Sequence, residues 1–240
     1  MTRPPAEDAA RALVAERFPD AVQAWLAGST TTGRATETSD LDITVLRDAG
    51  EVYRESVEYA GWPVELFVHT PASVEHFVVK DLQRRHPTMA RLVATGVPLL
   101  GEERGADVRR YCEGVLEGGP GAATPDELEL MRYGLTDQLD DLADVGPGPE
   151  AAAVAIGVWQ ATAELALALA ESWHGTGKWL VRELQALDAR EGTHLTTALD
   201  TGLRRAMTGE RGSLISVADA VLERSGGRHW AGLHRAATLP

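Results

Sequence analysis

Short apolar runs and longer helical patterns are mixed in the first half of the chain. Residues 5–18 place apolar side chains on one helical face, and a second helical stretch begins near Pro71 and is interrupted at Pro87, which lacks a backbone donor. Five runs have the pattern of strands: 21–27, 41–46, 51–59, 63–69 and 97–100. The run 41–46 alternates as a half-buried strand does, and the runs 51–59 and 63–69 have the form of a hairpin.

The second half shows helical spacings throughout. Thr124, Pro125 and Glu127 form a helix start, with threonine as N-cap, proline at the first helical position and glutamate closing a capping box. This helix should stop before Gly146. Residues 151–173 are apolar enough for a membrane span, but their polar side chains and many alanines favour a helix buried in a bundle. Further helices are expected at 178–190, 194–207 and 213–224.

A cluster of helix-breaking residues, Gly118-Gly119-Pro120-Gly121, separates the two halves. We therefore expect an α+β fold in which residues 1–117 form a domain with a mixed β-sheet flanked by helices. Residues 118–123 would be a linker, and 124–240 a helical bundle.

Composition excludes several classes of protein. With 240 residues, of which 44% are hydrophobic and 25% charged, the chain is neither disordered nor fibrous. The net charge of −13 lacks the basic footprint of a nucleic-acid binder, so we expect no nucleic-acid partner. One cysteine, Cys112, excludes an intramolecular disulfide and suits a reducing compartment. Without a signal-peptide pattern at the start or a membrane span, we expect a cytoplasmic protein; nothing indicates its oligomeric state.

Two carboxylates and a glycine turn suggest a phosphate-handling site. Asp40 and Asp42 lie two apart along a strand, so alternation places both on one face, with Cα atoms roughly 6.6 Å apart. Mg²⁺ is typically held by one or two carboxylates plus substrate phosphates. Gly28 allows a tight turn after the first strand, and Ser29 and the amides after it can bind a phosphate.

A third carboxylate, Glu65, is expected on the strand 63–69. The period of two places it on the face opposite Val64 and Leu66. By itself such a residue equally fits the solvent face of an edge strand. Beside a strand that carries two aspartates, the catalytic interpretation is favoured.

The segments Leu26-Ala27-Gly28-Ser29 and, after a gap of about ten residues, Ser39-Asp40-Leu41-Asp42-Ile43 resemble the signature of the DNA polymerase β-like nucleotidyltransferase superfamily. Antibiotic nucleotidyltransferases, including aminoglycoside and lincosamide adenylyltransferases, pair such a domain with a C-terminal helical domain, and this chain resembles that arrangement. The resemblance implies that Asp40 and Asp42 bind Mg²⁺ and that Glu65 is the third acid. It also implies that the triphosphate is held by Gly28, Ser29 and Ser39.

Two features of the second half fit this activity less specifically. Lys178 follows Gly-Thr-Gly, and the resemblance implies that it would contribute a cation to the triphosphate, although a lysine at an exposed helix start is the favoured explanation. Four aspartates form an acidic stripe along one expected helix, at positions 137, 140, 141 and 144. Asp137 and Asp141 would then bind an amine-bearing acceptor; the alternative is an ordinary solvated face.

The sequence therefore predicts a Mg²⁺-dependent nucleotidyltransferase. We expect it to move a nucleoside monophosphate, AMP from ATP or the equivalent from another nucleoside triphosphate, onto a hydroxyl of a small molecule such as an aminoglycoside-like antibiotic. The acceptor is expected in a cleft between the two domains. One alternative is a toxin–antitoxin-like transferase that modifies a protein or RNA. The other is a nucleotide-binding protein without catalysis.

Overall fold

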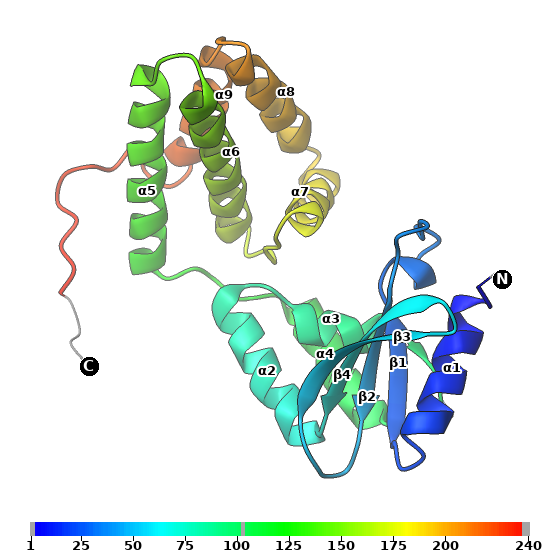
Figure 1. Ribbon diagram of the computed structural model, residues 1–240. Helices are drawn as coiled ribbons and strands as arrows, with labels where there is room; N and C mark the ends of the chain where they lie inside the picture. Colours follow the sequence, from blue (N-terminus) through cyan, green and yellow to red (C-terminus); the bar gives the residue numbers. More distant parts are fainter. Residues whose placement is uncertain (1–2, 102–103, 237–240) are drawn as a thin grey trace. The chain divides into compact units, whose positions relative to one another are not determined.

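The computed structural model describes residues 3–101 and 104–236, and the chain divides into two compact units, Met1–Gly119 and Pro120–Pro240 (Figure 1). The first unit combines strands and helices, whereas the described elements of the second are helices. The predicted α+β fold class, with a mixed sheet followed by a helical region, is confirmed.

A five-stranded sheet with the order β3-β4-β2-β1-β5 forms the centre of the first unit. Strands β2 and β4 run parallel, and every other neighbouring pair is antiparallel, which makes the sheet mixed. The predicted hairpin is present as β3 and β4. In this strand order, β3 lies at one edge of the sheet. The strands are β1 Gln23–Ala27, β2 Leu41–Leu46, β3 Tyr53–Tyr59, β4 Trp62–His69 and β5 Val97–Pro98.

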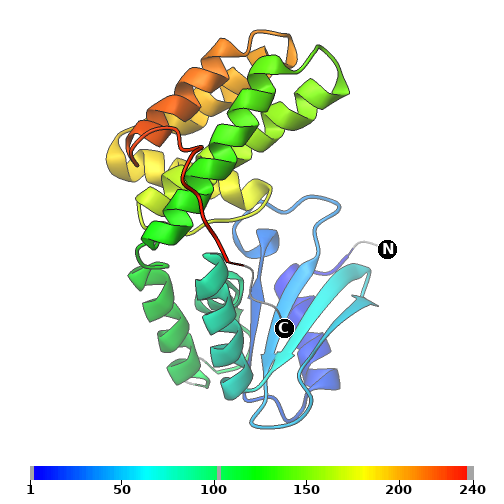
Figure 2. The same ribbon diagram turned by 90° about the vertical axis from the view of Figure 1, so that its left-hand side faces the viewer.

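Helices cover both faces of this sheet (Figure 2). Helix α1, Ala6–Arg17, buries Leu13 and Val14 against one face, in a cluster that includes Leu41, Ile43 and Leu66. Apolar side chains of three further helices pack with Trp25 and Leu46 on the opposite face. These helices are α2 Pro71–Arg84, α3 Thr88–Ala94 and α4 Ala106–Gly118. The sequence patterns did not predict α4.

Strand β2 departs from the half-buried strand that its alternation predicted. It lies between β4 and β1 and is covered on both faces, so five of its six residues are buried, Thr44 completely. The exception is Asp42, which stays partly exposed near the beginning of the strand. An acidic side chain in such a strand stands out from its surroundings, because carboxylates are seldom buried without a partner.

The second unit is a helical bundle whose first helix begins as predicted. The Thr124 side chain accepts from the Glu127 backbone, the Glu127 side chain accepts from the Thr124 backbone, and Pro125 is the first helical residue. The apolar helix ends at Leu169, earlier than predicted, and residues 172–175 are buried without being helical. The helices are α5 Pro125–Asp144, α6 Pro149–Leu169, α7 Lys178–Glu191, α8 Leu195–Met207 and α9 Gly212–Glu223.

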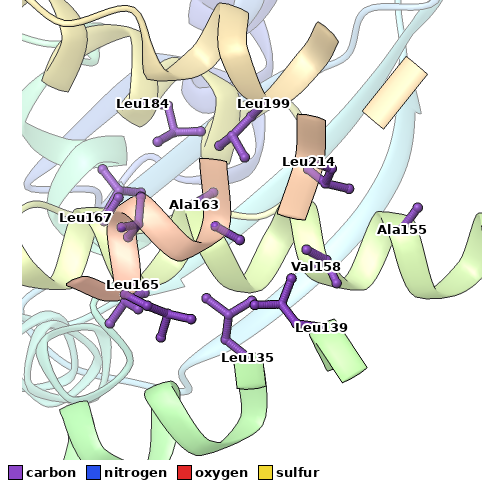
Figure 3. Close-up of a cluster of buried hydrophobic side chains, with 14 of the residues drawn as sticks. Leu135, Leu139, Ala155, Val158, Ala163, Leu165, Leu167, Leu184, Leu199 and Leu214 are labelled. Atoms are coloured by element: carbon purple, nitrogen blue, oxygen red, sulfur yellow. The ribbon is translucent and has the colours of Figure 1, made fainter. Parts of the chain in front are cut away.

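Leucine and alanine side chains from all these helices form the core of the second unit (Figure 3). Helix α6 is long and apolar enough to cross a membrane by length and composition, and 44% of that apolar window is buried within the structure. Its residues Val158, Ala163 and Leu165 pack beside Leu135 of α5 and Leu214 of α9. The helix therefore contributes to the core of the bundle.

Candidate active site

A glycine turn at the end of β1 brings the backbone against a carboxylate. Gly28 has φ +90° and ψ −160°, a conformation that side chains disfavour, and it precedes the short 3₁₀ helix Ser29–Thr31. A Cβ atom on Gly28 would lie 2.5 Å from Oδ2 of Asp42. The position therefore needs glycine for two reasons, its backbone conformation and the space beside Asp42.

The two serines predicted to hold a triphosphate are joined to each other. The Oγ atoms of Ser29 and Ser39 lie 2.9 Å apart, within hydrogen-bond distance, and Ser39 Oγ also accepts from the Thr36 backbone at 2.9 Å. Ser39 is buried, whereas Ser29 is partly exposed. Hydrogen bonds thus connect residues from both ends of the loop between β1 and β2, directly before Asp40.

Three carboxylates converge at the beginning of β2. Asp42 lies opposite Glu65 in the parallel pair of β2 and β4, and Asp40 directly precedes β2. One carboxylate oxygen of each residue lies within 4.8 Å of those of the other two, and all three side chains are partly exposed. Because β4 lies inside the sheet between β3 and β2, Glu65 is not on an edge strand, and that alternative is wrong.

The sequence patterns missed a basic residue at this site. Arg54 lies on the edge strand β3, and its Nη2 donates to both Oε1 and Oε2 of Glu65 at 2.6 Å. Its guanidinium also lies over the ring of Phe67, 5.1 Å from the centroid. The alternation of β3 shows that Arg54 is an exposed residue, but the contact depends on the register with β4, which no local pattern reveals.

The acidic triad, which we define as Asp40, Asp42 and Glu65, suits a hard divalent cation. Carboxylate oxygens are the ligands that Mg²⁺ prefers, and the three groups are close enough to repel one another unless a cation offsets their charge. Because Gly28 has no side chain, the Asp42 carboxylate has room next to the turn. The donor set therefore fits a magnesium ion together with the phosphates of a nucleotide.

The remaining predicted site residues lie in the second unit. Lys178 is exposed and is the first residue of α7, after the turn at Gly177. Asp137 and Asp141 are exposed on α5. A third member of the acidic stripe, Asp140, pairs with Arg228 at 2.9 Å.

Two other residues, a histidine and a cysteine, have reactive side chains but are buried parts of the fold. His69, at the end of β4, is buried, and burial lowers its pKa to about 4. Its Nδ1 is 2.9 Å from Ser73 Oγ in the first turn of α2. Cys112 lies on α4 and is buried, and burial raises the pKa of its thiol to about 12. A thiol with this pKa is a poor nucleophile at neutral pH.

Comparison with known proteins identifies the first unit. Residues 8–94 match the family model of the nucleotidyltransferase domain, and this segment contains the glycine turn and the whole acidic triad. The protein is therefore a nucleotidyltransferase enzyme, as the signature predicted. No curated protein matches the chain. Among solved structures, a nucleotidyltransferase-like protein from Exiguobacterium sibiricum 255-15 is similar, with 13% identity, a TM-score of 0.40 and coverage of 90% of this chain and 78% of that one.

Proposed function

We propose that this protein transfers a nucleoside monophosphate, AMP from ATP in the first place, onto a hydroxyl group of a small molecule in a Mg²⁺-dependent reaction. The observation that carries the proposal is the convergence of Asp40, Asp42 and Glu65 within 4.8 Å inside the segment that matches a nucleotidyltransferase domain. Phosphoryl-type transfer depends mainly on alignment and on offsetting developing charge, and this donor set is suited to both tasks.

In the proposed reaction, the acceptor hydroxyl oxygen forms a bond to the α-phosphorus. The bond between that phosphorus and the oxygen bridging to the β-phosphate breaks, and pyrophosphate leaves. Mg²⁺, when bound, offsets the charge on the phosphate oxygens. Asp40 and Asp42 would hold the cation. Glu65 would either complete the metal site, in which case the hydroxyl proton passes to solvent, or accept that proton itself.

The turn after β1 is the proposed triphosphate site. Gly28 allows the backbone to approach closely, and the partly exposed Ser29 offers a hydroxyl beside the triad, supported by its hydrogen bond to Ser39. Lys178 of the second unit is proposed as a further cation for the triphosphate. Its exposed position at the start of α7 supports this role.

The acceptor is proposed to be a cationic small molecule, such as an aminosugar of the aminoglycoside kind. The net charge of −13 and the exposed Asp137 and Asp141 support this class, because ammonium groups are attracted to an acidic surface. The same charge disfavours nucleic acid as acceptor. With one cysteine, kept as a buried thiol, we place the enzyme in the cytoplasm.

The test is incubation of the purified protein with Mg²⁺, each labelled nucleoside triphosphate and a panel of hydroxyl acceptors, followed by mass spectrometry. We expect a mass gain of one nucleoside monophosphate on a small acceptor, with release of pyrophosphate. Label on a co-purifying protein or RNA would favour the toxin–antitoxin-like alternative. Nucleotide binding without turnover on any acceptor would favour the non-catalytic one.

Variants of the triad sharpen this experiment. Asp40→Asn and Asp42→Asn each keep the side-chain volume and remove a metal-binding charge, so both should abolish turnover while the melting temperature is retained. Asp48→Asn is the matched control, because Asp48 is exposed just after the opposite end of β2. Wild-type turnover in both triad variants would refute the assignment.

A further inference from the structure

The contact between Arg54 and Glu65 is the strongest feature that the proposed reaction leaves unexplained. The Nη2 atom of Arg54 lies 2.6 Å from each carboxylate oxygen of Glu65, so both oxygens are engaged by the same group. Charge-assisted hydrogen bonds of this length are among the stronger ones in proteins. One carboxylate of the acidic triad is therefore already neutralised without a metal ion.

The sheet positions this arginine from the edge strand. In the register of β3 and β4, Ser56 is opposite Glu65, and Arg54 is opposite Phe67, on the same face two residues along. Arg54 thus reaches Glu65 along the diagonal of the pair while its guanidinium rests over the Phe67 ring. Its side chain remains 61% exposed, so it can leave Glu65 without opening the core.

We propose that Arg54 is a built-in counter-ion of the acidic triad, which holds Glu65 until a divalent cation displaces it. This inference rests on the proposed function, because it takes the triad as the metal site. A guanidinium and a divalent cation compete for the same carboxylate oxygens, and each repels the other. Arg54 keeps the carboxylates assembled without metal and lowers their affinity for a free divalent cation.

The consequence is a positioning role that acts through Glu65. A cation that arrives with a nucleotide brings phosphate charge that offsets the repulsion by Arg54, whereas a free cation does not. The arginine therefore favours loading of the metal together with its nucleotide. Since Arg54 changes the metal affinity itself, the effect is measurable without any turnover.

The test is titration of the nucleotide-free protein with Mn²⁺, followed by electron paramagnetic resonance of the free ion. Arg54→Gln should bind Mn²⁺ roughly tenfold more tightly than the wild type, since one unit of positive charge beside a divalent cation is removed at a partly exposed site. Arg54→Lys, which keeps the charge, should stay close to the wild type. Unchanged or weaker Mn²⁺ binding by Arg54→Gln would overturn the proposal.

A matched control lies on the other face of the same strand. Arg17 of α1 pairs with Glu55 of β3 at 2.8 Å, and its guanidinium lies over the Phe18 ring, 5.6 Å from the centroid. Arg17→Gln therefore removes the same charge from the same kind of pair, but from the face away from Arg54, and should leave Mn²⁺ affinity unchanged. An equal gain in both variants would show a general charge effect and overturn the specific role of Arg54.

The experiment also separates this inference from the proposed function. If the wild type binds Mn²⁺ and Asp42→Asn weakens it, the triad is the metal site, and the Arg54 variants then decide the inference alone. If wild type and Asp42→Asn bind Mn²⁺ equally, the triad is not the metal site. The proposed function then fails together with the inference. A thermal melt of each variant confirms that the compared proteins are folded.

Discussion

Gly28 links the backbone of a turn to the position of the Asp42 carboxylate. Gly28→Ala would introduce a Cβ atom 2.5 Å from Asp42 Oδ2 and also strain the backbone at φ +90°. We expect turnover to fall at least tenfold, because the carboxylate must move, and the free energy of unfolding to fall by about 1–3 kcal/mol. Turnover assays and urea unfolding of the purified variant measure both effects.

Gly33 is the natural control for that substitution. It lies in the same loop at φ +68°, but a Cβ atom there would meet nothing within 4 Å. Gly33→Ala therefore shares the backbone strain without the steric conflict and should retain turnover at a modest cost in stability. If the two variants lost turnover equally, the space beside Asp42 would not be what requires glycine.

Single residues show what sequence can and cannot reveal about a site. The spacing of Asp40 and Asp42 indicated one shared face, and the period of two in the next strand indicated Glu65, because alternation is a local property of a strand. The contact of Arg54 with Glu65 could not be predicted, because it depends on the register of two strands. Arginines exposed on an edge strand are common, and the sequence alone does not mark this one.

At the scale of elements, strong local signals were the reliable ones. Helix α5 starts at a complete capping box, and its limits were predicted to within a few residues. Helix α4 was missed because it starts after Gly105 without a side-chain cap and has Cys112 as its fully buried residue. The burial of β2 on both faces was also missed, since covering helices come from distant parts of the chain.

The junction of β4 and α2 gives the fold a pH dependence. His69 is buried there with its pKa lowered from 6.5 to about 4, so the folded protein disfavours the protonated ring that the unfolded chain accepts readily. Its contribution to stability is therefore present above pH 6.5 and is lost as the pH falls toward 4. The melting temperature of the wild type should fall over this range.

The variant His69→Gln isolates this effect. Glutamine does not titrate, so the variant should lose less stability between pH 6.5 and 4, although it starts from a lower value because it disturbs the contact with Phe77. Carboxylates also titrate toward the acidic end, which is why the difference between the two proteins is the informative quantity. Parallel melting curves would contradict the assignment of this pH dependence to His69.

At the scale of the whole molecule, the chain between the two units should be the first point of cleavage. Helix α4 ends at Gly118 and α5 begins at Pro125, and the residues between them are non-helical and none of them is buried. Each unit has its own buried core. Brief digestion with subtilisin should therefore nick within 118–123 and give two fragments of similar size, identified by mass spectrometry. Initial cleavage within 22–46 or 151–173 would contradict the proposed division.

We propose that the charge of the second unit influences which acceptor the enzyme favours. Asp137 and Asp141 are exposed on α5. The double variant Asp137→Asn with Asp141→Asn should raise KM for a cationic acceptor roughly threefold to tenfold, with little change in KM for ATP. Asp140→Asn is the control, because Asp140 is already paired with Arg228 and its charge is partly offset. The same acceptor should lose affinity as salt is raised, since these charges are screened over ~10 Å at 0.1 M. Equal effects on KM for both substrates would indicate that the stripe is an ordinary solvated helix face. A neutral or anionic acceptor would refute the proposal of a cationic acceptor, but not the proposed metal-dependent transfer.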